Sequence, residues 1–326
     1  MSSKKSKSQN TAVAYGKKQS GFSAFIQDFA GYKKYWQLSL MFLPIVVYFI
    51  VFKYIPMGGI VMAFKDYKIR LGIFGSEWNG LENFTRLFAT KTFARAVENT
   101  LEISLLRILF GFPVPIILAL LLNEVTHNGY KKAVQTITYL PHFISWVVLA
   151  GLFEQLLSPS NGALNSILGT LFGMEPIYFL GDNEYFRGTM IVTGIWKGAG
   201  WSSILYLAAI SGIDPSLYEA AKCDGATRLQ CTRFITLPCI ASTITVMLIL
   251  EVGGILDAGF DQIFNMYNSA VYETADIIDT YVYRVGIGDM KYAQGTAVGL
   301  FKNGIGFILV VCTNWITKRI NGNGIW

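Results

Sequence analysis

The chain alternates between long apolar stretches and shorter polar connections. A helix needs about 20 mainly apolar residues to cross the hydrocarbon core of a bilayer. Six stretches reach this length, and membrane helices tolerate the prolines found in them where neighbouring groups bond the freed carbonyls. The pattern therefore predicts an all-α membrane protein with six transmembrane helices, at residues 36–54, 100–122, 134–157, 189–210, 240–260 and 296–316.

Composition supports this prediction. Of the 326 residues, 52% are hydrophobic and 15% are charged, whereas about a quarter of the residues of a soluble domain are charged. The formal net charge of +6 is modest. Nucleic-acid binding is disfavoured, because no basic stripe with interleaved aromatic residues follows the beginning of the chain.

Lysines are concentrated at the start of the chain, and they predict its orientation. Lysine-rich flanks of membrane helices stay on the cytoplasmic side. Residues 1–34 are therefore expected to form a basic, flexible cytoplasmic tail, followed by a transmembrane domain of residues 35–326. With six spans both termini are cytoplasmic, as are the connections 123–133 and 211–239. The lysines of the tail are Lys4, Lys5, Lys7, Lys17, Lys18, Lys33 and Lys34.

The connection 211–239 is polar, although it lies between two apolar stretches. Asp214 or Ser216 can cap the start of a helix, and Pro215 suits the first helical position. Gly225 then breaks or turns the helix. The pattern predicts a short, hinged helix on the cytoplasmic membrane surface, where a partner can dock. An ordinary solvated connection between two spans is the alternative.

The same connection carries a motif of fixed positions, in which Glu-Ala-Ala precedes a glycine, an isoleucine and Leu-Pro at set distances. They are Glu219, Ala220, Ala221, Gly225, Ile235, Leu237 and Pro238. The motif resembles the EAA loop of permease subunits of bacterial binding-protein-dependent ABC importers. The resemblance implies the type I importer permease fold, with a cytoplasmic coupling helix between transmembrane helices 4 and 5. It assigns ATPase docking to Glu219, Ala220, Ala221, Lys222, Asp224, Gly225, Ala226 and Arg228.

Residues outside the motif resemble the carbohydrate branch of these importers, and more narrowly the permeases for complex oligosaccharides and polysaccharides. The resemblance implies a bacterial cytoplasmic membrane protein that forms half of a translocation pathway for an oligosaccharide. It also implies four kinds of partner: a second, homologous permease, two ATP-binding subunits, an extracytoplasmic sugar-binding protein and membrane lipid. The similar stretches are 139–148, 259–264, 279–284, 292–302 and the ending Gly324-Ile325-Trp326.

The chain has no phosphate-binding loop, because Gly16-Lys17-Lys18 lacks both the earlier glycine and the following Ser or Thr of that motif. ATP and Mg²⁺ are therefore expected on a partner ATPase, with no cofactor or metal bound by this chain. An intramembrane enzyme would need a nucleophile with a base, or metal ligands, on facing helices. The sequence suggests no such set, so we do not expect an enzyme. The two histidines, His127 and His142, are expected to be structural hydrogen-bonding groups.

Ionisable residues at membrane depth, such as Arg107 and Glu251, are costly in lipid and usually face a bundle interior or water. A sugar path needs polar hydrogen-bonding groups and flat aromatic faces. The alternative is structural, because Trp and Tyr also populate the membrane interfaces. The substrate-path candidates are Trp146, Glu154, Gln155, Trp196, Lys197, Trp201, Tyr206, Asp257, Asp261, Gln262, Asn265 and Tyr267.

Two other functions remain open. An ABC permease for a non-sugar solute, such as an amino acid, a peptide or phosphate, would share the docking motif. Only the stretches that resemble the carbohydrate branch argue against it. A membrane scaffold or sensor without transport would need no partner ATPase.

Overall fold

The computed structural model describes residues 36–321. The chain divides into two units, residues 1–59 and 60–326, and the boundary between them lies within the 3-10 helix Gly58–Phe64. The expected basic tail of residues 1–34 lies outside the described residues, as does the ending that contributes to the carbohydrate resemblance. The helices of the first unit cover the first predicted span, and they are α2 (Trp36–Phe49), a π-helical turn (Ile50–Tyr54) and α3 (Ile55–Met57).

The second unit begins with a short two-stranded sheet, in which Lys65 pairs with Trp78 and Asp66 pairs with Glu77. A long helix, Lys91–Glu124, then contains the second predicted span. The elements of this part are a 3-10 helix (Gly58–Phe64), β1 (Lys65–Asp66), α4 (Gly72–Gly75), β2 (Glu77–Trp78), α5 (Glu82–Phe88), α6 (Lys91–Leu106), a π-helical turn (Arg107–Gly111) and α7 (Pro113–Glu124).

The third predicted span, 134–157, is broken, so its prediction as one continuous helix is wrong. Two helical pieces, Asn128–Phe143 and Trp146–Leu156, meet at an angle of 104°. Ser145 has extended backbone and its side chain accepts a hydrogen bond from the amide of Val148, so a new helix begins there. The elements are α8 (Asn128–Tyr139), a 3-10 turn (Leu140–Phe143), α9 (Trp146–Leu156), α10 (Ala163–Phe172) and α11 (Asn183–Ser211).

The fifth predicted span, 240–260, is too long. Helix α15 ends at Gly253, a non-helical stretch follows, and Gly259 has a φ of 82°. The adjacent glycines Gly253 and Gly254 mark the end of the helix, because glycine leaves helical backbone at a low cost in free energy. The remaining elements are α12 (Pro215–Cys223), α13 (Arg228–Cys231), a π-helical turn (Thr232–Thr236), α14 (Leu237–Cys239), α15 (Ala241–Gly253), α16 (Phe260–Met266), a 3-10 turn (Ser269–Val271), α17 (Tyr272–Ala275), α18 (Ile278–Tyr281), a π-helical turn (Val282–Gly288) and α19 (Tyr292–Asn321).

Within residues 36–321, three helices are long and apolar enough to cross a membrane, and two bent pairs raise that number to five. Helix α11 has 29 residues and contains the fourth predicted span, but it is less apolar and is not among the five. Helix α19 contains the sixth predicted span. The count of six transmembrane helices therefore stays a prediction.

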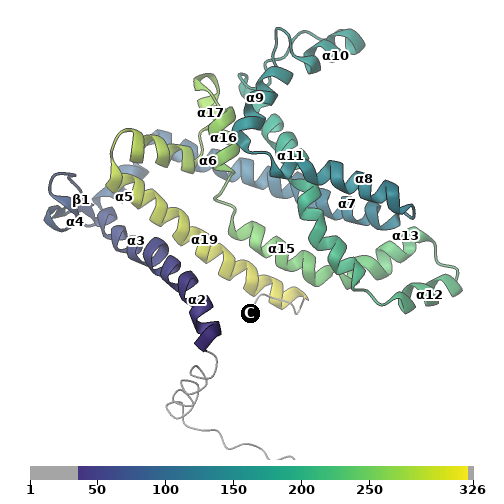
Figure 1. The fold of residues 1–326 in the computed structure, drawn as a ribbon. Coiled ribbons are helices and arrows are strands. Elements are labelled where there is room, and N and C mark those ends of the chain that lie inside the picture. Colours follow the sequence, from purple (N-terminus) through teal and green to yellow (C-terminus); the bar gives the residue numbers. More distant parts are fainter. Residues whose placement is uncertain (1–35, 322–326) are drawn as a thin grey trace, which may run out of the picture. The chain divides into compact units, whose positions relative to one another are not determined.

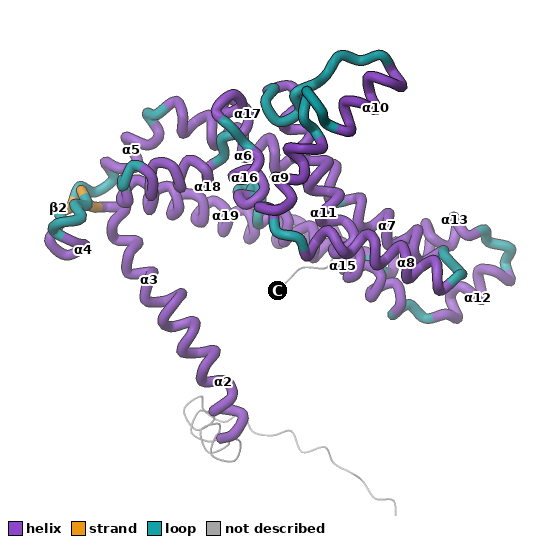
Figure 2. Tube along the Cα trace, turned by 45° about the horizontal axis from the view of Figure 1, so that its top comes forward, coloured by secondary structure: helices purple, strands orange, loops and turns teal. Residues whose placement is uncertain are grey.

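Helix α11 organises the packing of the second unit, because α7 and α8 both lie against it (Figure 1). A Cβ atom at Gly200 would overlap the backbone carbonyl of Thr138, so α11 and α8 approach closely only because this residue is glycine. Helices α15 and α19 pack together, as do α9 and α16. In Figure 2 most of the described chain is helical, with loops between the helices and one short pair of strands.

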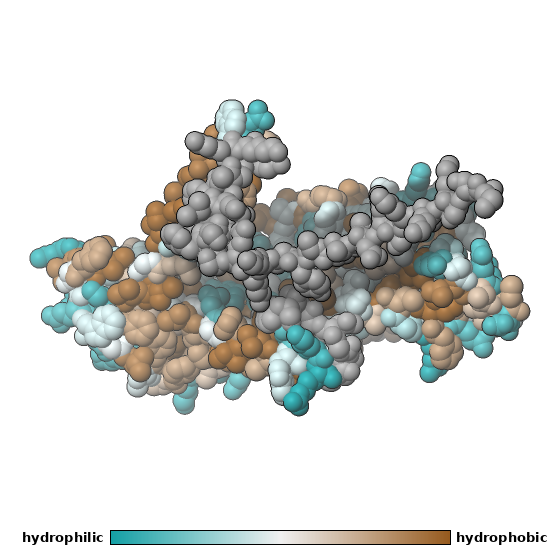
Figure 3. Space-filling view, turned by 90° about the horizontal axis from the view of Figure 1, so that it is seen from below, coloured by the Kyte–Doolittle hydropathy of each residue, from teal (hydrophilic) through white to brown (hydrophobic). Residues whose placement is uncertain are grey.

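The surface of the second unit carries many large apolar side chains, including Leu109, Leu121 and Phe307, each more than half exposed. Figure 3 shows such side chains spread over much of the visible face, with hydrophilic residues mainly toward the edges. Monomeric soluble proteins rarely expose large contiguous apolar patches. This surface is the one expected of a protein that contacts lipid or other membrane subunits.

Candidate functional site

The docking segment, residues 211–239, starts its helix as its sequence predicts. Asp214 caps α12 by accepting a hydrogen bond from the amide of Ser216 at 2.9 Å, and Pro215 takes the first helical position. The hydrogen bonds from the backbone and side chain of Ser216 lower the pKa of Asp214 below its usual range. The carboxylate satisfies an amide that would otherwise lack a partner at the helix start.

Gly225 ends α12, and it has a φ of 77°. The amide of Gly225 donates to the carbonyl of Lys222 at 3.0 Å, and the amide of Ala226 donates to that of Ala221 at 2.9 Å. This left-handed termination is one that glycine adopts at low cost. The predicted short helix is therefore present and ends at the predicted glycine, whereas its roles as a hinge and as a coupling helix stay predictions.

A capping box starts the next helix, and the sequence analysis missed it. Thr227 accepts a hydrogen bond from the amide of Gln230, whose side chain accepts one from the amide of Thr227 at 2.7 Å. The signal was available, because a Thr followed by a Gln three residues later marks a helix start. Helix α13 is thus fixed at its first turn, directly after the glycine.

The docking segment contacts the remainder of the unit through Arg228, which reaches Glu124 at 3.9 Å, and through Ile213, which packs against an apolar cluster that includes Ala119. Within the segment, the hydroxyl groups of Tyr218 and Thr236 lie 2.9 Å apart. Leu229 is 77% exposed, although it is apolar. Of the eight residues assigned to docking, Ala221 and Ala226 are half-buried and six are exposed: Glu219, Ala220, Lys222, Asp224, Gly225 and Arg228. This surface is available for a partner.

A cavity of about 1040 Å³ lies within the second unit. Its walls come from the π-helical turn after α6, the bend between α8 and α9, the middle of α11, the end of α15, and α16 with the loop before it. Seven of the substrate-path candidates line it: Trp146, Lys197, Tyr206, Asp257, Asp261, Gln262 and Asn265. Residues that are far apart in sequence therefore meet here.

A second cavity, of about 350 Å³, lies between α9 and α16. The candidates Glu154 and Tyr267 line it, and Asn265 lines both cavities. Burial raises the pKa of Tyr267 to about 12, so its phenol remains protonated at physiological pH. Tyrosine hydroxyls and amide side chains suit the hydrogen bonding of sugar hydroxyls.

Three candidates line neither cavity. Trp201 stacks on His142 with ring centres 4.6 Å apart, and Trp196 packs edge-on against Phe153. Gln155 is exposed. Their assignment to a sugar path stays a prediction.

Lys197 holds the bend between α8 and α9. Its ammonium group donates to the carbonyl of His142 at 2.7 Å and to that of Pro141 at 3.4 Å. It also lies 5.5 Å from the ring centre of Trp146. A lysine that bonds the last carbonyls of a helix stabilises its carboxyl end, so this cation fixes the shape of the cavity wall.

Arg107 is the other cation of the large cavity. Its Nη2 donates to Oε1 of Gln262, and the amide of Gln262 donates to the carbonyl of Met190 at 2.8 Å and to Thr193 Oγ1 at 2.9 Å. The side chain of Gln262 is almost completely buried. Sequence patterns did not indicate this pairing, because the partners lie on three separate elements.

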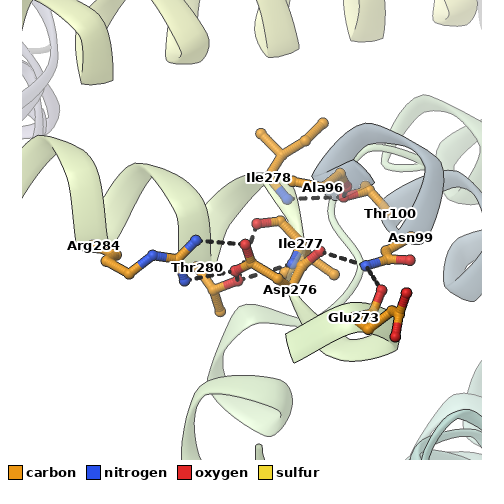
Figure 4. A network of polar contacts seen from close by, with 9 residues as sticks. All are labelled: Ala96, Asn99, Thr100, Glu273, Asp276, Ile277, Ile278, Thr280 and Arg284. Atoms are coloured by element: carbon orange, nitrogen blue, oxygen red, sulfur yellow. Dashed lines mark hydrogen bonds and ion pairs between the residues drawn. The ribbon is translucent and has the colours of Figure 1, made fainter. Parts of the chain in front are cut away.

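A buried polar network fixes residues 273–284, which follow α16 in the sequence (Figure 4). Asp276 accepts hydrogen bonds from Thr280 at 2.8 Å and from Arg284 at 2.5 and 2.9 Å. The pairing with Asp276 raises the pKa of Arg284 above its ordinary value. Asn99 donates to the backbone carbonyls of Glu273 at 3.1 Å and Asp276 at 3.0 Å, so α6 is tied to α17 and α18.

Comparison with known proteins identifies the family. Residues 111–321, more than half of the chain, match the binding-protein-dependent transport system inner membrane component. The chain belongs to this family. Membership confirms that it is a multi-pass membrane permease and a transport component, not an enzyme.

Two curated relatives come from Bacillus subtilis (strain 168). The polygalacturonan/rhamnogalacturonan transport system permease protein YteP is 49% identical over 89% of this chain and 90% of its own length. The protein LplB is 45% identical over 89% of this chain and 91% of its own length. These relatives agree with the resemblance to ABC permeases of the carbohydrate branch.

A solved structure supports the same fold. The crystal structure of a bacterial ABC transporter that imports the acidic polysaccharide alginate contains a chain with 46% identity and a TM-score of 0.83. The match covers 90% of this chain and 99% of the other. The predicted type I importer permease fold is therefore confirmed, whereas the roles of single residues stay predictions.

Proposed function

We propose that this chain is a permease subunit of an ATP-driven importer for acidic oligosaccharides and forms half of the translocation pathway. The observation that carries the proposal is the high similarity to two acidic-glycan systems, one for polygalacturonan and rhamnogalacturonan and one for alginate. A cavity of about 1040 Å³, with aromatic and hydrogen-bonding side chains, supports it. Pockets of this size are typical of small-molecule sites.

The partners follow from the same proposal. The exposed α12 and α13 dock an ATP-binding subunit, which carries ATP and Mg²⁺. A second, homologous permease supplies the other half of the pathway, and a second ATP-binding subunit docks on it. An extracytoplasmic sugar-binding protein delivers the cargo, and support comes from an alginate transporter solved with an alginate pentasaccharide-bound periplasmic protein.

The proposed location is the bacterial cytoplasmic membrane, with both termini in the cytoplasm. This orientation places the docking segment on the side where ATP is available. Labelling of a Lys222→Cys variant that lacks the native cysteines tests it. The thiol should react with membrane-impermeant reagents only in inverted vesicles, and reaction in intact cells would reverse the proposed topology.

Purification of the importer from membranes tests the function. The complex should contain a second permease and ATP-binding subunits, and its ATPase in proteoliposomes should rise severalfold when the binding protein presents oligogalacturonate or alginate oligosaccharides. Neutral maltotriose and a mixture of amino acids serve as controls. Stimulation of the ATPase by amino acids would contradict the proposal. Failure of every saccharide to stimulate it would contradict the proposal too.

A further inference from the structure

Arg107 lies in an unusual position for a cation. It falls within Lys91–Glu124, one of the helices long and apolar enough to span the membrane. Ionisable groups at membrane depth are costly and commonly mark substrate paths. Arg107 is also the first residue of a π-helical turn, Arg107–Gly111, and such turns within α-helices frequently occur at functional sites.

The guanidinium group is held in a fixed direction. Gln262 accepts one of its hydrogen bonds, and α11 holds Gln262 through Met190 and Thr193. A Cβ atom at Gly259 would overlap the guanidinium group, so the absence of a side chain there makes room for it. A guanidinium oriented in advance loses less entropy when it binds a ligand.

The charge of Arg107 has no direct counter-ion among residues 36–321. Its one hydrogen bond there goes to a neutral amide, and no carboxylate oxygen lies within 4.0 Å of its nitrogens. Glu251 and Asp257 line the same cavity and act on the charge of Arg107 from a distance, but neither forms an ion pair with it. A guanidinium carries five N–H donors, so donors remain for a ligand in the cavity.

Lys197 provides the contrast within the same cavity. Its ammonium group is already engaged with the carbonyls of Pro141 and His142. It is also a compact point charge, whereas the planar fork of a guanidinium matches the two oxygens of a carboxylate. The two cations therefore differ in the donors that remain free for a ligand: Lys197 bonds the cavity wall, whereas Arg107 lines the cavity with one hydrogen bond to a neutral amide.

We propose that Arg107 anchors a carboxylate group of the acidic oligosaccharide in the large cavity, with Gln262 as the residue that positions it. This inference rests on the proposed function and deepens it. Two parallel N–H···O bonds bind one uronate carboxylate, and the aromatic and amide side chains around the cavity contact the ring hydroxyls. The site thereby selects charged sugar rings over neutral ones of the same shape.

The test compares two ligands of one shape with two variants of one cavity. Uptake of oligogalacturonate and of its neutral methyl ester is measured in proteoliposomes with the intact complex and the same binding protein throughout. The wild-type complex should prefer the acid. Arg107→Gln should lower this preference at least tenfold, and Arg107→Lys should lower it less. Arg86→Gln, which removes an equal charge from an exposed position outside both cavities, should keep it.

Each outcome either supports or overturns the inference. A purely structural role would slow uptake of acid and ester alike, so an unchanged preference in Arg107→Gln would overturn the inference. An equal loss of preference in Arg86→Gln would overturn it too, because it would show a diffuse charge effect. If Arg107→Gln does not assemble, Arg107→Lys provides the test in its place. A preference for the acid equal to that of the wild type would then overturn the inference. A wild-type complex that transports neither saccharide overturns the proposed function itself.

Discussion

The docking segment, residues 211–239, and the segment that follows α15, residues 254–291, are stabilised in opposite ways. In the first, most hydrogen bonds, such as that of Asp214 with Ser216, join residues two to five positions apart, and the longer one between Tyr218 and Thr236 also stays within the segment. In the second, local hydrogen bonds are joined by others whose partners lie far away in sequence. The amide of Ile278 donates to Thr100 Oγ1 at 2.9 Å, across 178 positions.

The difference has a functional meaning. A segment built from local bonds keeps its own shape when it moves, so it can follow a docked partner without losing structure. A segment held by distant partners is fixed to the core of the unit, and it can change position only if those contacts change. Breaking the first should impair coupling, and breaking the second should impair folding.

The largest expected effect comes from Asn99, whose side chain is only 3% exposed. It bonds the carbonyls of Glu273 and Asp276 and accepts from Arg187 at 2.7 Å. Asn99→Leu leaves all three groups without that partner. The bond to Asp276 is buried and the other two are partly buried, and a buried polar group left without a partner costs about 1–3 kcal/mol. We expect a loss of stability of about 3 kcal/mol or more, measured as a fall of several degrees in the melting temperature of the purified complex.

Asn161→Ala is the matched control for this prediction. Asn161 is exposed in the loop before α10, where it accepts a hydrogen bond from Ser160. Exposed substitutions of this kind change stability by about 0.5 kcal/mol or less. Equal melting temperatures for Asn99→Leu and wild type would show that the distant contacts do not fix the segment.

Sequence reasoning succeeded where structure is local. The cap at Asp214 and the break at Gly225 are each specified by residues a few positions apart, and both are present. It failed at the third span, which bends, and at the fifth, whose helix ends early, because an apolar stretch has the right composition whether its helix continues, bends or ends. Pro141 and the glycines at 253 and 254 were visible signals, but membrane helices often tolerate both.

The cavity shows the same limit. Chemical type alone selected side chains such as Lys197 and Asn265, which do line it. It also selected Trp196 and Trp201, which pack against other rings. Only tertiary contacts separate these groups, and only they bring Arg107 to Gln262.

A second prediction concerns the hinge of the docking segment. Gly225 has a φ of 77°, and no atom lies within 4 Å of the position of a Cβ. The cost of a substitution there is consequently in the backbone, since a β-branched residue rarely adopts a positive φ. Gly225→Val should lower uptake about tenfold, which corresponds to 1.4 kcal/mol, while the complex still assembles. Uptake and ATPase activity measured on the same proteoliposomes check this.

Gly225→Asn separates the backbone effect from the presence of a side chain. Asparagine visits left-handed backbone more readily than other residues, so this variant should retain most of the uptake. Normal uptake by Gly225→Val would refute the idea that the geometry of the hinge matters for coupling. Failure of both variants to assemble would show that the docking segment also contributes to folding, contrary to the comparison.

The smallest effect is expected at the cap of α12, because the segment is exposed and its bonds are local. Asp214→Ala removes the acceptor for the amide of Ser216, and protection of the first amides of α12 from hydrogen exchange should fall about two- to fivefold. The pKa of Asp214 is lowered in the folded chain. The cap is therefore fully effective above the unfolded pKa of about 3.9, and it is lost as the pH falls through the lower folded pKa. Asp214→Asn keeps an acceptor that cannot titrate, so its protection should stay constant across that acidic range. If wild type and Asp214→Asn respond identically to acid, the carboxylate does not stabilise the helix start.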